Sequence, residues 1–360
     1  MPVGKETLNS SAGVDCYTLS NEESTLTVKV LNYGGILQQI LVPDRSGIVR
    51  DVTLGFDTYE EYTQITGPCF GALIGSIGQG KFTLDGATYQ LAINNGPNHL
   101  HGGLLGFDKK LWTVSIISQS PASIRLTHVS PDGDEGYPGT LTVNVIYTVT
   151  PSAELTIEYE ATTSDRATVV NLTNHAYFNL AGVSLNSKIL DHEVETLPAV
   201  LGYLELDDDS LPTGNFVPIG VTEVMDFSGP HASRTFGARI REVQGRGYDH
   251  PYVIRRDAET DTRSHALVEA MRVRSPETGI TLRFETTEPA FQLYTGNWVP
   301  ECLSKASMQG NVMLGQWSGF CLEASRNPDA PNKDEWKGQV VLRVGEKYGS
   351  KTVYAFGVRD

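Results

Sequence analysis

Apolar and polar residues alternate through much of the chain, and this alternation predicts β-strands. In the segment 154–170, Leu155, Ile157 and Tyr159 are separated by polar residues, so one face of a strand would be apolar and the other polar. The same pattern recurs along the sequence. It predicts strands at residues 26–30, 36–42, 112–117, 123–130, 141–150, 155–162, 266–275, 281–287 and 291–294.

Turn residues separate these segments. Asp85-Gly86 lies in the middle of segment 81–91 and predicts a hairpin. Turn signals recur about every 8–12 residues, a spacing typical of a sandwich or barrel. A helical pattern is confined to residues 58–64 and 236–243, and Gly and Pro are spread along the chain rather than gathered in a linker. The sequence therefore predicts a single all-β domain over residues 1–360, a large antiparallel β-sandwich with few short helices.

Composition and charge narrow the class of function. The chain has 43 acidic and 28 basic residues and a net charge of −15 at pH 7, which disfavours binding to the phosphates of nucleic acid. Its beginning lacks the apolar run of a secretory signal, and no segment is long and apolar enough to span a membrane. We therefore expect a cytoplasmic protein, a monomer or homodimer, that acts on a small molecule.

The four cysteines predict neither a disulfide framework nor a zinc site, since they lie far apart without Cys-x-x-Cys spacing. Reduced, mostly buried thiols fit a cytoplasmic protein better. The sequence also lacks a Gly-x-Gly-x-x-Gly motif after a strand, a phosphate-binding loop and a Gly-x-Ser-x-Gly motif, which disfavours nucleotide use and serine hydrolysis. The cysteines are Cys16, Cys69, Cys302 and Cys321.

His175 is the first candidate for chemistry. It lies in the stretch Asn171-Leu-Thr-Asn-His-Ala-Tyr-Phe-Asn-Leu, which follows an alternating segment, so we expect it at or just past the end of a strand. Two asparagines and two aromatic residues surround it, which would fix the imidazole and limit its access to water. Under these conditions a histidine is a useful proton donor or acceptor near neutral pH.

Two more histidines lie in the stretch Asn98-His-Leu-His-Gly-Gly. The glycines permit backbone conformations that let a ligand come close. His99 and His101 could bind a metal, but such a site needs a third and a fourth ligand, and no companion cluster is present nearby. The alternative is a hydrogen-bonded loop histidine, and we expect no metal.

Two carboxylates have neighbours that suit a functional role. Glu323 ends an apolar run, where a carboxylate is costly to bury unless it has partners or a shifted pKa, so it is a candidate general base or a salt-bridged strand-end glutamate. Asp249, in Gly247-Tyr-Asp-His-Pro-Tyr, suits a sugar, because a carboxylate accepts from hydroxyls and a ring covers an apolar face. Its alternative is a turn-stabilising role. Gln292 and Asn297 add neutral hydrogen-bonding groups.

Together these motifs resemble those of the aldose 1-epimerase (galactose mutarotase) family. The resemblance covers most of the chain, from Tyr33-Gly-Gly to the end, and several matches of this length in one order are highly specific. The markers are Asn98-His-Leu-His-Gly-Gly, Gly106-Phe-Asp-Lys-Lys-Leu-Trp, Ser130-Pro-Asp-Gly-Asp-Glu-Gly-Tyr-Pro-Gly, the stretch 171–180, Gly247-Tyr-Asp-His, Gln292-Leu-Tyr-Thr-Gly-Asn, and Cys321-Leu-Glu with Pro328-Asp-Ala-Pro-Asn.

The resemblance implies a galactose mutarotase-like β-sandwich that binds a hexose in an open cleft. It also implies interconversion of the α and β anomers without a cofactor. By position, His175 matches the family's general acid and Glu323 its general base. His101 matches the second active-site histidine, which helps to hold and polarise the sugar.

Four further positions are expected to bind substrate. Asp249 and Gln292 match family positions that hold sugar hydroxyls. Asn98 and Tyr177 lie in the matching motifs, beside the histidines, and are candidates for the same role.

One segment departs from the family's pattern. Where the family usually reads Ile-Gly-Arg, then a second arginine and then Gly-Lys-Phe, this chain reads Ile74-Gly-Ser-Ile-Gly-Gln-Gly-Lys-Phe82. The segment is shorter and both arginines are absent, the first of which normally helps to hold the substrate's hydroxyls. Losing this cationic, multi-donor group should weaken sugar binding and change the charge balance of the site, unless Ser76, Gln79 or Lys81 compensates.

Three functions follow from these observations. The first is a mutarotase that acts on free aldohexoses such as D-glucose or D-galactose. The second, which the missing arginines favour, is a repurposed isomerase or cyclase that acts on a non-sugar hemiacetal or a biosynthetic intermediate. The third is a carbohydrate-binding protein without turnover, and the presence of His101, His175 and Glu323 argues against it.

Overall fold

The computed structural model describes residues 3–64, 73–74, 80–228 and 235–359, and strands dominate it. The described residues include three short α-helices, none long or apolar enough to cross a membrane. The all-β prediction with few short helices is confirmed. The helices are α1 (Tyr59–Gln64), α2 (Ala306–Gln309) and α3 (Lys337–Val340).

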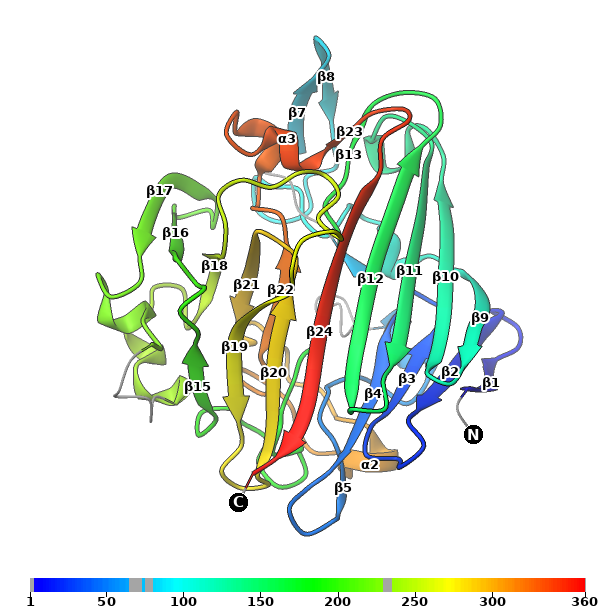
Figure 1. Ribbon diagram of the computed structural model, residues 1–360, viewed down its shortest axis with the longest axis vertical. Helices are drawn as coiled ribbons and strands as arrows, with labels where there is room; N and C mark the ends of the chain where they lie inside the picture. Colours follow the sequence, from blue (N-terminus) through cyan, green and yellow to red (C-terminus); the bar gives the residue numbers. More distant parts are fainter. Residues whose placement is uncertain (1–2, 65–72, 75–79, 229–234, 360) are drawn as a thin grey trace.

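The largest sheet has eight antiparallel strands in the order β15-β19-β20-β24-β12-β11-β10-β9. It forms the front layer in Figure 1. Its strands are β9 (Thr113–Gln119), β10 (Ala122–Ser130), β11 (Leu141–Val149), β12 (Glu154–Thr163), β15 (Glu193–Thr196), β19 (Val268–Arg274), β20 (Ile280–Thr286) and β24 (Tyr348–Val358).

Two five-stranded sheets supply the other side of the sandwich. One has the order β1-β2-β3-β4-β5 and the other the order β17-β16-β18-β21-β22. Their strands are β1 (Val3–Asn9), β2 (Val14–Ser20), β3 (Thr27–Leu31), β4 (Leu37–Pro43), β5 (Val49–Asp51), β16 (Gly202–Leu206), β17 (Pro212–Pro218), β18 (Asp249–Val253), β21 (Ala290–Tyr294) and β22 (Cys321–Ser325).

One buried apolar cluster joins the three sheets. Val28 of β3, Ile157 of β12 and Phe291 of β21 all belong to it and are fully buried. Each lies on the apolar face of an alternating strand, which must be buried against another layer to be stable. The alternation in the sequence therefore accounts for the sandwich.

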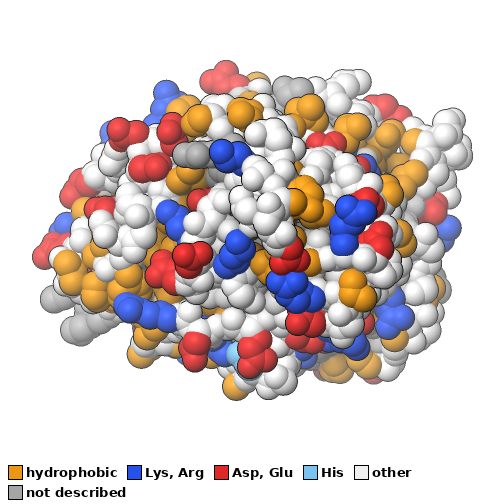
Figure 2. Space-filling model, turned by 90° about the horizontal axis from the view of Figure 1, so that it is seen from above, with side chains coloured by type: hydrophobic (Ala, Val, Ile, Leu, Met, Phe, Trp, Pro, Cys, Tyr) orange, Lys and Arg blue, Asp and Glu red, His pale blue; other side chains and the backbone are white. Residues whose placement is uncertain are grey.

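Three two-stranded pairs complete the described strands. They are β6 (Leu73–Ile74) with β14 (Thr173–Asn174), β13 (Thr168–Val169) with β23 (Val341–Leu342), and β7 (Lys81–Leu84) with β8 (Ala87–Gln90). The last pair is the predicted hairpin. Asp85 and Gly86 have φ of 50° and 81°, as a tight hairpin turn requires. Seen from the end where this hairpin lies, acidic and basic side chains are intermixed on the surface (Figure 2).

The strands predicted from alternation all form, with bounds shifted by a few residues, and so does the helix at 58–64. The helix predicted at 236–243 is wrong. Two 3-10 turns, Phe236–Ala238 and Ile240–Glu242, flank Arg239, whose φ of −135° is not helical. The non-helical backbone at Arg239 divides the segment into two separate turns. The N–H groups of Phe236 and Gly237, at its start, donate to the carbonyls of His192 and Leu190.

The central strand β24 was not predicted. Most of its residues are buried on both faces, and it includes Gly349 and Gly357. A strand buried on both faces does not show the alternation that reveals a half-exposed strand. It pairs with β12 on one side and with β20 on the other.

Candidate functional site

The third sheet carries a group of polar side chains on one face. Asp249 of β18 pairs with Tyr294 of β21, and Gln292 of β21 pairs with Glu323 of β22. Directly paired residues share a face, and so do residues two apart on one strand. Asp249, Gln292 and Glu323 therefore lie on the same face. Gln292 Nε2 donates a hydrogen bond to Asp249 Oδ1 at 2.7 Å.

His175 follows the short strand β14 directly, as the sequence predicts. The backbone around it is fixed, because Asn174 Oδ1 accepts a hydrogen bond at 3.0 Å from the N–H two residues on, and Phe178 pairs with Phe320. His175 Nε2 lies 3.7 Å from Glu323 Oε1. The imidazole therefore faces a carboxylate on the edge strand β22.

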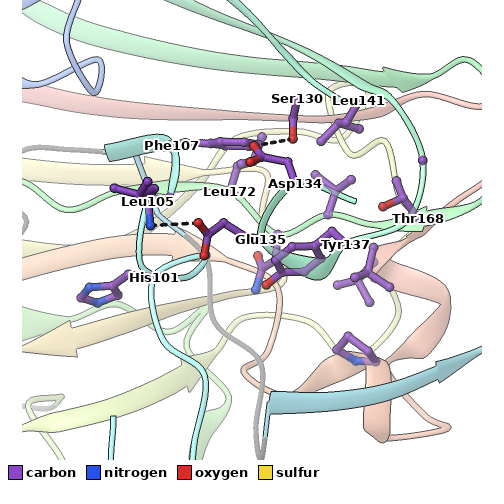
Figure 3. A pocket seen from close by; sticks show the side chains of 18 residues that line it. His101, Leu105, Phe107, Ser130, Asp134, Glu135, Tyr137, Leu141, Thr168 and Leu172 are labelled. Carbon is purple, nitrogen blue, oxygen red and sulfur yellow. Dashed lines mark hydrogen bonds between the residues drawn. The ribbon is translucent and has the colours of Figure 1, made fainter. Parts of the chain in front are cut away.

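His101 approaches His175 from a glycine-rich loop. Its φ is 57°, in the left-handed region that few residues other than glycine adopt. The two rings are nearly perpendicular, with centroids 5.4 Å apart. Glu135 holds the loop, since its carboxylate accepts hydrogen bonds from the N–H groups of Leu104 and Leu105 at 2.8 and 3.1 Å. Figure 3 shows the bond from Leu105.

His99 supports this loop from behind. Its Nδ1 lies 2.8 Å from the carbonyl oxygen of Ala92, which only accepts, so Nδ1 carries the proton. Its Nε2 then accepts from the Tyr137 hydroxyl at 2.8 Å. Both ring nitrogens are thus engaged, and His99 has no lone pair to share with His101 in a metal site.

Two tyrosines enclose the imidazole of His175. The ring of Tyr177 stacks on it with centroids 4.7 Å apart and planes 8° apart. The ring of Tyr294 meets it edge-on at 6.1 Å. All three side chains are buried, so the tyrosines fix the imidazole and keep most water away from it.

The remaining predicted positions have other surroundings. Asn98 is buried, and its Nδ2 donates to the backbone carbonyl of Asp209 at 3.1 Å. In the shortened segment, Ser76 and Gln79 lie outside the described residues. Lys81 is exposed at the start of β7. The described residues therefore place no compensating group from this segment at the site.

Burial shifts the ionisation of the facing pair. It raises the pKa of Glu323 well above its ordinary value, and the charge of Asp249 raises it further. It lowers the pKa of His175 well below its ordinary value, with a smaller effect from His101. In water a proton prefers imidazole to carboxylate. Burial therefore shifts the preference of the proton toward the carboxylate.

The flanking groups are shifted as well. Burial raises the pKa of Asp249 to about 6, opposed by the hydrogen bond from Gln292. Burial also lowers the pKa of His101 to about 4, helped by the charges of Lys109 and His99. At neutral pH His101 is therefore a neutral imidazole, while Asp249 is mostly ionised.

Acceptors in the site are unpaired among the described residues. None of these residues donates a hydrogen bond to the Glu323 carboxylate, although the residue is only 7% exposed. Gln292 Oε1 and His175 Nδ1 are also buried without a partner there. Unpaired buried polar atoms are costly. A ligand with several hydroxyl groups would satisfy them.

Positive charge is scarce at this site. Among the described residues, no lysine or arginine forms an ion pair with Asp249 or Glu323, and the pKa of neither carboxyl is lowered by a cation. The segments 65–72 and 75–79, which flank β6, contain no lysine or arginine either. The described residues therefore give the two carboxylates no cationic partner, and the shortened segment contains no arginine of the kind that the family usually provides.

A separate pocket borders the site at His101 (Figure 3). It is walled mainly by apolar side chains such as Leu105 and Phe107. Neither His175 nor Glu323 lines it. The pocket therefore lies behind the histidine loop and not where the facing pair meets.

Two site residues, Cys321 and Tyr294, were not singled out from the sequence. Cys321 pairs with Tyr294 and lies two residues before Glu323, so its thiol is on the site's face of β22. One ligand atom each of His175, Cys321 and Glu323 lies within 4.8 Å of the others. The sequence contained a signal for both, because residues two apart on a strand share a face. Cys321 is two positions from Glu323, and Tyr294 is two positions from Gln292.

We expect Asp249→Asn to stabilise the protein at neutral pH. The folded carboxyl has a pKa of about 6 against an ordinary value of 3.8, so the folded state loses stability as the pH rises from the lower of these values to the higher. The cost is fully present above pH 6 and disappears below about pH 4. The difference between these two pKa values corresponds to at most about 3 kcal/mol. The asparagine still accepts from Gln292, so we expect a gain of about 1–3 kcal/mol.

Urea unfolding of the Asp249→Asn variant and the wild type at pH 8 and pH 4 measures this gain. The difference in midpoint should be large at pH 8 and small at pH 4. An equal difference at both pH values would show that the carboxyl of Asp249 does not carry the cost.

Comparison with known proteins places the chain among sugar epimerases. The aldose 1-epimerase family model matches residues 15–355. Galactose mutarotase of Sus scrofa is 40% identical over 356 residues, which cover 98% of this chain and 96% of the relative. Aldose 1-epimerase of Escherichia coli is 32% identical, with 94% of each chain covered.

Solved structures agree with the sequence comparisons. A homologue of galactose mutarotase and aldose epimerase from Caenorhabditis elegans superposes with a TM-score of 0.79 at 26% identity, covering 95% of this chain and 98% of that one. Galactose 1-epimerase from Lactobacillus acidophilus gives a TM-score of 0.77 at 25% identity, covering 99% and 98%. The predicted galactose mutarotase-like sandwich is confirmed.

Proposed function

The chain belongs to the aldose 1-epimerase family and is an isomerase, and from this we propose that it interconverts the α and β anomers of a free aldohexose such as D-glucose or D-galactose, with His175 as general acid and Glu323 as general base. The observation that carries the proposal is the buried pair, His175 Nε2 and Glu323 Oε1, 3.7 Å apart. A proton donor and a proton acceptor held side by side suit two oxygens that are bonded to one carbon.

The reaction needs two proton transfers. His175 delivers a proton to the ring oxygen while Glu323 removes the proton of the anomeric hydroxyl, so the bond between the ring oxygen and the anomeric carbon breaks and an aldehyde forms. The aldehyde rotates about its bond to the next carbon. Reclosure on its other face returns each proton to the group that gave it up, and the opposite anomer results.

The ionisation of the pair suits this cycle. The closed sugar needs protonated His175 and ionised Glu323, whereas the open sugar leaves both groups neutral. Burial favours the neutral forms, so the site stabilises the ring-opened state relative to the closed one. Positioned general acids and bases each contribute a factor of about 10² to 10⁴.

The surrounding polar groups hold the sugar. Asp249 and the free Gln292 Oε1 accept hydrogen bonds from hydroxyl groups, and the hydrogen bond between these two side chains orients them. His101, neutral at pH 7, helps to hold and polarise the sugar next to His175. Tyr177 orients His175 by stacking on it. Asn98 fixes the loop that carries His101 and is a further candidate for substrate binding.

Optical rotation tests the proposal. Freshly dissolved α-D-glucose and α-D-galactose are followed with and without the purified protein. We expect a faster approach to equilibrium with at least one sugar, and loss of the acceleration in Glu323→Gln. Glu23→Gln, at an exposed position, is the matched control and should keep the activity. A folded wild-type protein that accelerates neither sugar would contradict the proposal.

A second function is favoured by the missing arginines. It keeps the acid and base but serves a non-sugar hemiacetal or a biosynthetic intermediate. This function would be supported if the protein accelerated neither sugar in the optical-rotation assay but converted such a hemiacetal, and if that conversion required Glu323. Sugar binding without turnover would instead support a carbohydrate-binding protein.

A further inference from the structure

We propose that His175, Cys321 and Glu323 form a binding site for a zinc ion, or a similar divalent ion with affinity for thiolate, and that this ion inhibits the isomerase. The inference rests on the geometry of three buried side chains, and its inhibitory part rests on the function proposed above. Imidazole nitrogen, thiolate sulfur and carboxylate oxygen are the ligand types that zinc takes in proteins. Neither the sequence spacing of the cysteines nor the proposed reaction predicts this site.

The geometry of the three ligands is close to what zinc needs. Tetrahedral zinc with bonds of about 2.0–2.3 Å places its ligand atoms about 3.3–3.8 Å apart. His175 Nε2 and Glu323 Oε1 are already 3.7 Å apart, and one ligand atom of each of the three residues lies within 4.8 Å of the others. Small side-chain rotations would complete the site.

The backbone supports this arrangement. Cys321 and Glu323 are two residues apart on β22 and point to one face, while His175 is held opposite them by its stacking on Tyr177. Three protein ligands leave the fourth position of a tetrahedral ion for water or a sugar hydroxyl. Glu323 is 7% exposed, so the described residues leave a small part of this side chain in contact with solvent.

The charge of the site favours a cation. Glu323 lies close to Asp249, and no lysine or arginine among the described residues pairs with either carboxylate. None of the described residues donates a hydrogen bond to the Glu323 carboxylate. The segment that usually carries an arginine in the family has none here. A divalent ion supplies the positive charge that the described residues do not.

Binding would block catalysis directly. The ion takes the lone pair of His175 that accepts a proton and the carboxylate oxygen of Glu323 that serves as base. The Cys321 thiol releases its proton to water when its sulfur binds the ion. A group bound to zinc neither delivers nor removes the protons of ring opening. Zinc is therefore an inhibitor here, and removing it with a chelator should not lower activity.

Cobalt(II) tests binding independently of activity, because a thiolate bound to cobalt gives a charge-transfer absorption in the near ultraviolet. We expect this absorption when cobalt(II) is added to the wild type, and its loss in Cys321→Ser. Cys302→Ser is the matched control, since Cys302 is half-buried and outside the site. Absorption that persists in Cys321→Ser would overturn the proposal.

Zinc inhibition of anomer interconversion is then measured on the same variants. We expect the wild type and Cys302→Ser to be inhibited alike, with full recovery in chelator. Measured against its own rate without zinc, Cys321→Ser should require about tenfold more zinc or more for the same fractional inhibition, equivalent to at least about 1.4 kcal/mol of binding.

The two measurements separate the possible failures. Equal inhibition of the wild type and Cys321→Ser, or no inhibition with no cobalt absorption, would overturn the site. Cobalt absorption that depends on Cys321, without inhibition, would leave the ion site standing and contradict the roles of His175 and Glu323. If the wild type is inactive before any metal is added, the optical-rotation test contradicts the proposed function, and the cobalt absorption alone then decides on the ion site.

Discussion

The Glu323→Gln and His175→Asn variants are each expected to interconvert anomers about 10² to 10⁴ times more slowly than the wild type, the factor that a positioned acid or base contributes. Glutamine has the shape of glutamate but takes up no proton, and asparagine neither donates nor accepts one as imidazole does. The loss should fall on kcat more than on KM, because the groups act in the transition state. Polarimetry at several sugar concentrations measures both constants.

The loss of activity in these variants should not be accompanied by an equal loss of stability. Burial raises the pKa of Glu323 because the charged form is disfavoured, so a neutral amide at this position removes a cost. Glu323→Gln is therefore expected to be at least as resistant to urea as the wild type. A folded variant of either residue with near-wild-type kcat would remove that residue from its catalytic role.

The Arg326→Met variant is expected to be less stable than the wild type by about 3–5 kcal/mol, the usual cost of leaving one partner of a buried ion pair alone. Arg326 follows β22 and is fully buried with its partner Glu288. It also donates to the carbonyls of Gln339, Thr260 and Gly349. Removing the guanidinium leaves a buried carboxylate without its cation and takes one donor from each of these three carbonyls, of which those of Thr260 and Gly349 keep another donor. The midpoint of urea unfolding measures the loss.

An exposed ion pair provides the matched control. Arg343 pairs with Asp85, and both side chains are about half exposed. Arg343→Met should leave the midpoint of urea unfolding almost unchanged, because exposed ion pairs add little stability. Adding Glu288→Leu to Arg326→Met should restore part of the lost stability, because the double variant no longer buries an unpaired charge. Equal midpoints for Arg326→Met and Arg343→Met would contradict this account.

Much of the architecture could be predicted because half-buried strands carry their own signature. Segments such as 141–150 and 155–162 alternate strictly, and β11 and β12 form there with bounds within a residue or two. The alternating pattern does not reveal a strand that is buried on both faces, and local patterns can also predict a helix that does not form. β24 is mostly buried on both faces and so was missed, and the segment 236–243 forms two separate turns because the backbone at Arg239 is not helical.

The sequence by itself determined the family and the candidate residues, because long motifs in a fixed order are specific and because His175, Glu323 and Asp249 have unusual neighbours. It also showed that the family's arginines are missing. Only the tertiary structure decided that β14 and β22 bring His175 and Glu323 face to face, that His99 is fully hydrogen-bonded, and that Cys321 joins the pair. The physical reason is that distance, burial and pKa depend on contacts between segments far apart in the chain, which no local pattern encodes.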